Sequence, residues 1–126
     1  MASLPSQIAA ITLFVESPAA AREFYSRVFG LPVHFEDDES VVFAFGDTLV
    51  NLLAVSAVPE LIAPAEVGTG SRSVFTLPVD DVDARCAELQ AKGVVLLNGP
   101  VDRPWGVRTA AFQDPDGYVW ELATPL

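Results

Sequence analysis

Side chains of the kinds that carry out covalent or metal chemistry are scarce in this chain of 126 residues. It has one histidine, His34, and one cysteine, Cys86, so an internal disulfide and a zinc site with two or four cysteine ligands are excluded. A catalytic serine would need His34 as its base, and nothing in the sequence places a serine beside it. The G-x-S-x-G, P-loop and G-x-G-x-x-G motifs are missing as well. The residues therefore argue against nucleophilic catalysis and nucleotide binding.

The chain is strongly acidic, with 17 Asp and Glu against 7 Lys and Arg and a formal net charge of −10. Such a charge disfavours binding to the phosphate backbone of nucleic acids. The acidity fits either solubility or the attraction of a cationic ligand. No segment approaches the roughly 18 apolar residues of a membrane span, and the first residues lack the basic segment of a secretory signal. We therefore expect a cytoplasmic protein with neither a nucleic-acid nor a membrane partner.

Apolar runs, helix caps and turns predict the same series of elements twice. The first series is a strand over residues 8–15, a helix over 19–29 and strands over 32–36, 40–45 and 48–55. The second is a strand over residues 73–79, a helix over 82–92 and strands over 94–98, 106–112 and 118–123. Prolines and glycines mark residues 56–71 as a linker, with a short helical turn expected over 59–63.

The letters of the two halves also repeat. A shift of 64 residues places Thr12 on Thr76, Leu13 on Leu77, Val15 on Val79 and Ala20 on Ala84. Either an internal duplication or two coincidentally similar strand–helix starts would give this match. The matching order of elements favours duplication, with module one at about residues 8–55, the linker at 56–71 and module two at 72–126.

This arrangement resembles the vicinal oxygen chelate superfamily, which includes glyoxalase I, extradiol dioxygenases and the fosfomycin and bleomycin resistance proteins. Three stretches carry the likeness: residues 11–31, residues 75–94 and residues 105–122, where the last contains the closing DPDGYVWEL hairpin. The resemblance implies an α+β fold in which tandem βαβββ modules form a curled mixed sheet with an open cleft. It also implies one glyoxalase-like domain over residues 1–126, which pairs as a homodimer.

In the metal-using branches of that superfamily, His and Glu side chains on the first and last strands of each module bind a divalent ion. Carried over residue by residue, the histidine positions fall on Ala10 and Val74, which have no donor atoms. The glutamate after DPDG is Glu121, and its counterpart in module one is Asn51, give or take one residue. We therefore expect no metal and no other cofactor. The alternative is an octahedral ion completed by substrate oxygens and water around Glu121.

Strand alternation then predicts which side chains line the cleft. The expected ligand-binding residues are Thr12, Phe14, Asn51, Val74, Thr76, Trp105, Arg108 and Glu121. They describe a mostly apolar site with a few orienting polar groups, as small-molecule sites usually are. Two simpler interpretations stay open: Glu121 forms a structural ion pair with Arg108 on the neighbouring strand, and Trp105 serves as a lid or a dimer contact.

The function expected from these observations is metal-free binding, or sequestration, of a small molecule, in the manner of the bleomycin resistance proteins. A cationic aromatic compound would suit the charge of the chain. One alternative is a metal-dependent lyase or dioxygenase of the same superfamily with an altered metal site around Glu121. A further alternative is a small-molecule sensor domain.

Overall fold

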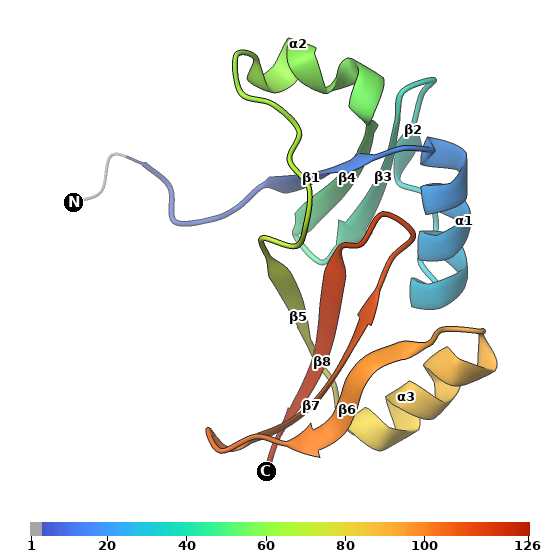
Figure 1. Ribbon diagram of the computed structural model, residues 1–126, viewed down its shortest axis with the longest axis vertical. Helices are drawn as coiled ribbons and strands as arrows, with labels where there is room; N and C mark the ends of the chain where they lie inside the picture. The colour runs from blue at the N-terminus through green and yellow to red at the C-terminus, as the bar shows by residue number, and fades with distance from the viewer. Residues whose placement is uncertain (1–3) are drawn as a thin grey trace. The chain divides into compact units, whose positions relative to one another are not determined.

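The computed structural model describes residues 4–126, and these form two compact units that divide between Val67 and Gly68. Each unit contains one four-stranded mixed sheet (Figure 1). The predicted α+β fold with two βαβββ modules is confirmed.

Module one begins with a parallel pair of strands at one side of its sheet. Its elements are β1 (Ala10–Val15), α1 (Pro18–Phe29), β2 (Phe35–Glu36), β3 (Ser40–Phe45) and β4 (Thr48–Ala54). The strand order is β1-β4-β3-β2, with β1 parallel to β4 and the other pairs antiparallel. A short 3-10 turn, η1 (Val55–Ala57), and the helix α2 (Val58–Ile62) follow, where the sequence predicted a helical turn.

Module two repeats this topology. Its elements are β5 (Val74–Pro78), α3 (Val82–Ala91), β6 (Leu96–Asp102), β7 (Val107–Gln113) and β8 (Val119–Pro125). The strand order is β5-β8-β7-β6, again with only the first pair parallel. The repeated order of elements that the sequence predicted is therefore present in the two sheets.

Local chemistry explains where the helices begin and end. Ser17 caps α1, because its hydroxyl accepts a hydrogen bond from the Ala20 amide at 3.1 Å, and Gly30 ends the helix in the left-handed conformation with φ 67°. Asp81 caps α3 in the same way, accepting from the Ala84 amide at 3.1 Å.

Each helix covers one face of its own sheet with apolar side chains. In module one, Tyr25 of α1 stacks on Phe43 of β3, with ring centroids 5.9 Å apart. In module two, Val82, Cys86 and Leu89 of α3 are buried, as are the strand residues Ala110, Phe112, Trp120 and Leu122. Burial of this kind supplies most of the stability of such short helices.

Most strand boundaries lie within two residues of the predicted ones, and two strands differ by more than that. The strand expected over residues 32–36 is reduced to Phe35–Glu36. Pro32 has no amide hydrogen to donate to a ladder, although the His34 amide still donates to the Val42 carbonyl oxygen at 2.8 Å. The strand expected over residues 94–98 begins later and continues to Asp102. There the chain passes through Gly99 with φ 81°, and the pairing of β6 with β7 shifts register on both sides of Asn98. Such a bulge interrupts a ladder without ending the strand.

Candidate functional site

The face of each sheet that carries no helix of its own module is the candidate site, and we call it the open face. Alternation along the strands assigns the side chains to it, because the residues between them are buried or partly buried on the face that packs against α1 or α3. In module one the open face includes Ala10, Thr12, Phe14, Leu49, Asn51 and Leu53. In module two it includes Val74, Thr76, Pro78, Val119, Glu121 and Ala123.

The two open faces carry the same kind of polar pair at equivalent positions. Thr12 lies opposite Asn51 in the β1–β4 ladder, and Thr76 lies opposite Glu121 in the β5–β8 ladder. Thr12 and Thr76 are also partners in the sequence repeat. Each sheet therefore presents a threonine hydroxyl beside an amide or a carboxylate, at the centre of an otherwise mostly apolar surface.

The pair in module one leaves one acceptor unused. Asn51 Nδ2 lies 3.5 Å from Thr12 Oγ1, which makes a long hydrogen bond, whereas Asn51 Oδ1 is shielded from solvent and has no hydrogen-bond partner within residues 4–126. A shielded polar atom without a partner costs about 1–3 kcal/mol.

The pair in module two is better satisfied. Thr76 Oγ1 donates a hydrogen bond of 2.9 Å to Glu121 Oε1. Thr76 is exposed and Glu121 is partly exposed, so the remaining lone pairs of the carboxylate stay available to a donor or a cation.

Arg108 corrects the sequence-based picture of the cleft. Arg108 pairs with Thr124 in the β7–β8 ladder while Ala111 pairs with Glu121, so Arg108 and Glu121 point to opposite faces of the sheet. The Arg108 guanidinium donates to both oxygens of Asp83 in α3, at 2.7 and 3.0 Å, and to Asp102 at 2.9 Å. The interpretation of Arg108 as an ion-pair partner of Glu121 is wrong, and the structure places Arg108 on the face covered by α3.

Arg103 is the charged residue of the open face that the sequence analysis missed. Its Nε donates to Thr109 Oγ1 at 2.9 Å, and its Nη2 donates to Asn98 Oδ1 at 3.2 Å. Thr109 pairs with Ala123, and Asn98 pairs with Ala111, the partner of Glu121, so these side chains share the open face. Strand alternation could not have found Arg103, because it follows the last residue of β6 and the register shifts around Asn98 break the alternation before it.

Trp105 lies next to this arginine. The Cζ atom of Arg103 is 5.7 Å from the centre of the Trp105 ring, which is the range of a cation–π contact. Trp105 is 68% exposed, whereas Trp120 is 3% exposed and belongs to the core. An exposed indole beside a held guanidinium offers a flat surface on which a planar ligand could stack.

The side chains present do not fit the metal site of the metal-using relatives. Ala10 and Val74 offer only hydrocarbon at two of the four positions, and Glu121 already accepts a hydrogen bond from Thr76. Within residues 4–126, no three or more His, Cys, Asp or Glu side chains gather closely enough to hold an ion. One carboxylate and one amide are too few for a hard cation, which takes several oxygen ligands.

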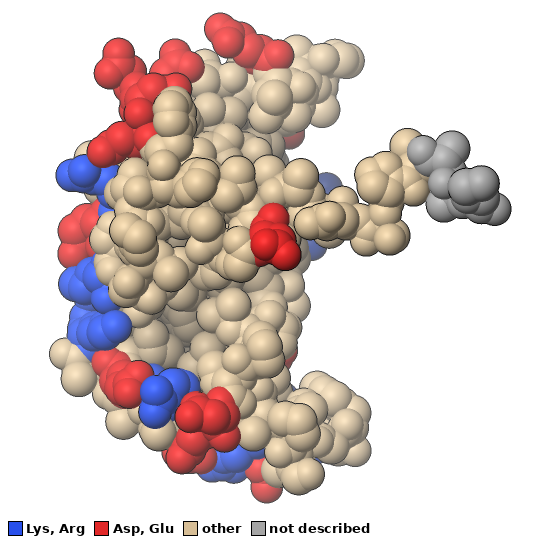
Figure 2. Space-filling model, turned by 180° about the vertical axis from the view of Figure 1, so that it is seen from behind, with Lys and Arg blue, Asp and Glu red and all other residues tan. Residues whose placement is uncertain are grey.

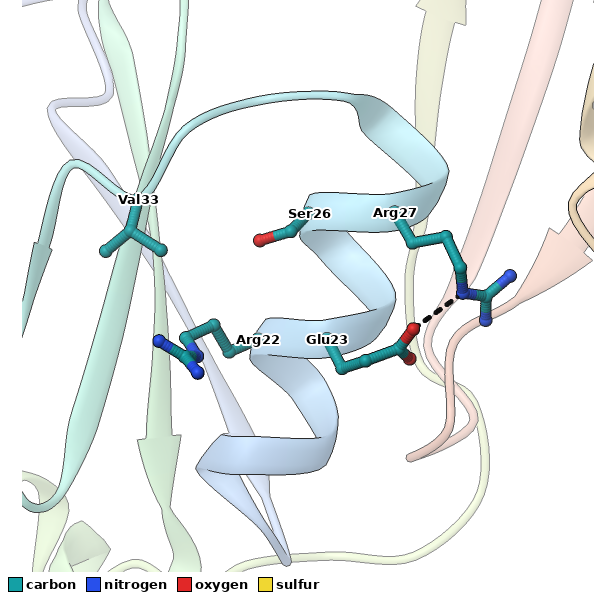
Figure 3. Close-up of a pocket in the computed structure, with 5 residues that line it drawn as sticks. All are labelled: Arg22, Glu23, Ser26, Arg27 and Val33. Atoms are coloured by element: carbon teal, nitrogen blue, oxygen red, sulfur yellow. Dashed lines mark hydrogen bonds and ion pairs between the residues drawn. The ribbon is translucent and has the colours of Figure 1, made fainter.

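A separate shallow groove of about 400 Å³ lies on the exposed side of α1, away from the open face of module one (Figure 3). It is lined by Arg22, Glu23, Ser26, Arg27 and Val33. Arg22 pairs with Glu36 at 3.2 Å and Arg27 pairs with Glu23 at 2.7 Å, so its cations are already compensated. Figure 2 shows the same alternation of basic and acidic side chains along the side that carries α1. We therefore do not assign the site to this groove.

Two βαβββ modules, each with a polar pair on its open face, are typical of the superfamily that the sequence resembles. Comparison with known sequences identifies the same superfamily. The chain belongs to the Glyoxalase/Bleomycin resistance protein/Dioxygenase superfamily, whose family model matches residues 7–122. The predicted membership of the vicinal oxygen chelate superfamily is confirmed.

Individual relatives cover nearly all of the chain. The uncharacterized protein YraH of Bacillus subtilis (strain 168) is 32% identical over 119 residues, which are 89% of this chain and 93% of YraH. The crystal structure of TnmS3, an antibiotic binding protein from Streptomyces sp. CB03234, is 29% identical, with a TM-score of 0.77 and full coverage of both chains. A glyoxalase/bleomycin resistance protein/dioxygenase from Nocardioides has a TM-score of 0.86 at 22% identity, over 100% of this chain and 87% of its own, which shows a shared fold.

The helices of residues 4–126 are all too short or too polar to cross a membrane.

Proposed function

We propose that this protein binds a small organic molecule on the open faces of its sheets without the help of a metal ion. The observation that carries the proposal is the pair of hydrocarbon side chains, Ala10 and Val74, at the positions where metal-using relatives have ligands. The similarity to TnmS3, which is described as an antibiotic binding protein, supports a role in binding rather than turnover.

The chemistry of the open faces suits such a ligand. Apolar side chains such as Phe14 and Leu53 give hydrophobic contact area on the open face of module one. In module two, Glu121 and its partner Thr76 supply a carboxylate and a hydroxyl. An aromatic body would suit the apolar open face of module one, and a hydrogen-bond donor or a positive charge would suit Glu121 of module two. The net charge of −10 would attract a cationic ligand.

The test is a fluorescence titration of the purified protein against a broad panel of aromatic compounds of different charge. Trp105 is the exposed indole, so a ligand near it should change the emission, and a Trp105→Phe variant should abolish that change. Binding with a stoichiometry of one or two per chain, confirmed by calorimetry, is the expected result. A flat response in both methods across the whole panel would contradict the proposal.

A second candidate function rests on Glu121, the one side chain of ligand type at the four family positions. A metal-dependent lyase or dioxygenase would need an ion held by Glu121 and completed by substrate and water. Equilibrium dialysis against Ni²⁺, Zn²⁺, Mn²⁺ and Fe²⁺, followed by elemental analysis, separates the two functions. Stoichiometric metal that is lost in a Glu121→Gln variant would favour the enzyme; metal-free protein that still binds organic ligands favours sequestration.

Membership of the superfamily also leads us to propose a homodimer. Sedimentation equilibrium should then give twice the mass of the chain, and a monomer at micromolar concentration would contradict this assignment.

A further inference from the structure

Arg103 differs from the other hydrogen-bonded or ion-paired arginines in residues 4–126, because its side-chain acceptors are neutral. The others are paired with carboxylates: Arg22 with Glu36, Arg27 with Glu23, Arg85 with Asp80 and Glu88, and Arg108 with Asp83 and Asp102. Arg72 has no ion pair within residues 4–126 either, but it is exposed, whereas Arg103 is partly buried and held by neutral side chains.

The two neutral acceptors fix the guanidinium in place. Thr109 holds Nε and Asn98 holds Nη2, so the plane of the group is set by two of its donors. Nη1 makes no hydrogen bond to any residue from 4 to 126, and the side chain is only partly exposed. A guanidinium that is already positioned and keeps donors unused suits recognition of a carboxylate, sulfonate or phosphate, since little side-chain entropy is lost on binding.

The backbone next to this arginine is tightly packed at Gly99. Gly99 has φ 81°, and a Cβ atom there would collide with the carbonyl oxygen of Thr109 and the Cα of Ala110. The resulting bulge lies between Asn98 and Val101 in the β6–β7 ladder, and bulges of this kind redirect neighbouring side chains. It places the Asn98 amide where it can accept from Arg103.

The charged groups near Arg103 leave its positive charge uncancelled. Asp102 is bonded to Arg108, which points to the face covered by α3. Glu121 shares the open face but lies opposite Ala111, whereas the partner of Arg103, Thr109, lies opposite Ala123, one step further along the ladder. No ion pair joins Glu121 and Arg103 within residues 4–126.

We propose that Arg103 and Trp105 form an anchor for a small planar organic anion, with the acidic group of the ligand on the guanidinium and its ring against the indole. The inference rests on the proposed binding function and deepens it by naming the chemical class of the ligand at one end of the site. Because Glu121 is the carboxylate of the same face, the other end of the ligand carries a hydrogen-bond donor or a positive charge.

The test compares three probes that share one naphthalene ring and carry an anionic, a neutral or a cationic group: 2-naphthoate, 2-naphthamide and 2-naphthylmethylammonium. Isothermal titration calorimetry on the full chain should show the acid binding about tenfold more tightly than the amide, the range expected for a charge-assisted hydrogen bond. Arg103→Gln should remove that preference. Arg22→Gln, which changes the net charge equally on α1 of the other module, should keep it. Arg103→Lys retains the charge but loses the planar fork, so it should keep only part of the preference.

The outcomes separate the two proposals. Equal binding of the acid and the amide, or tightest binding of the ammonium probe, would overturn the anion anchor while leaving small-molecule binding in place. Failure of all three probes would count against the proposed function and, with it, the anchor. A preference for the acid that persists in folded Arg103→Gln and Arg103→Lys would place the anion elsewhere on the chain.

Discussion

At the scale of single residues, Glu121 shows how one side chain can support two different functions. It is the ligand-type residue of the four family positions, yet its carboxylate accepts a hydrogen bond from Thr76 on a surface that lacks the other ligands. Its position in the sheet is the same whether it meets an ion or an organic cation. Measurements on variants of this carboxylate therefore decide whether it binds a metal ion or an organic cation.

We expect the Glu121→Gln variant to bind cationic aromatic ligands about tenfold more weakly, because the amide keeps the shape of the side chain but loses its charge. We expect both the variant and the wild type to contain no metal. Calorimetry and elemental analysis check the two statements, and Asp47→Asn, a change in the β3–β4 turn with the same effect on net charge, is the control. Unchanged ligand binding would remove Glu121 from the site.

Cys86 lies in the core of module two, where its thiol is poorly reactive. It is 2% exposed under the sheet of module two, and burial is the main reason why its pKa is raised above the ordinary 9.0, with the nearby charge of Asp83 adding to it. We expect native protein to react with a thiol reagent on the order of a thousandfold more slowly than urea-unfolded protein, because opening is required first. Comparable rates would mean that α3 opens freely.

The open face shows how far sequence reasoning reached. Alternation from position 10 placed Thr12, Asn51, Thr76 and Glu121 correctly on the face without a helix, because a strand has only two sides. Arg108 was placed on the wrong face, because the pairing of two strands depends on the turn between them and not on either strand alone. Arg103 was missed, because the local letters around Gly99 and Pro100 read as the end of a strand.

At the scale of elements, Arg108 connects α3 to β6, and this connection depends on pH. The hydrogen bonds from Arg108 hold the pKa of Asp83 below its ordinary value of 3.8. A carboxyl group whose pKa is lower in the folded state adds stability above its unfolded pKa, and this contribution is lost as the pH falls through the folded pKa.

We therefore expect Asp83→Asn to lower the urea midpoint at neutral pH and to have little effect in acid, once the wild-type carboxyl is protonated. Urea titrations at both pH values check this, with Asp47→Asn as a matched control because Asp47 has no arginine partner within residues 4–126. An equal loss of stability at both pH values would show that Asp83 acts through its shape and not through its charge.

The bulge in β6 is a second feature of the elements that can be tested, because it depends on the glycine at position 99. Gly99→Ala should destabilise the protein by about 2 kcal/mol or more, because a side chain there adds a collision to the cost of a positive φ. Gly93→Ala is the matched control, with φ 85° and no atom within 4 Å of the added Cβ, and it should cost about 1 kcal/mol. Equal losses in chemical denaturation would mean that the sheet adjusts and that the bulge is not tightly defined.

At the scale of the whole molecule, the two modules share both the threonine of the open face and the lack of a metal-ligand side chain two residues before it. Both modules retain the threonine of the open face, at positions 12 and 76, and both have a hydrocarbon side chain two residues earlier. The order and type of the elements were predictable from the sequence, because caps and turns mark the ends of the helices and strands. The repetition of the same order in both halves supported that prediction. The polar partners, Asn51 in one module and Glu121 in the other, differ, so the two open faces are chemically distinct.

The net charge of −10 acts on every ligand at long range, whereas Arg103 acts only at contact. Salt screens the first effect strongly, because the Debye length falls from about 30 Å at 0.01 M to about 8 Å at 0.15 M ionic strength. The second effect is screened less, since the guanidinium is partly buried.

Stopped-flow measurements over this range of salt should therefore show 2-naphthoate associating severalfold faster as repulsion weakens, while 2-naphthylmethylammonium associates more slowly. If added salt slowed the anion as well, the field at the site would be positive at long range, and the acidity of the chain would play no part in selecting its ligand.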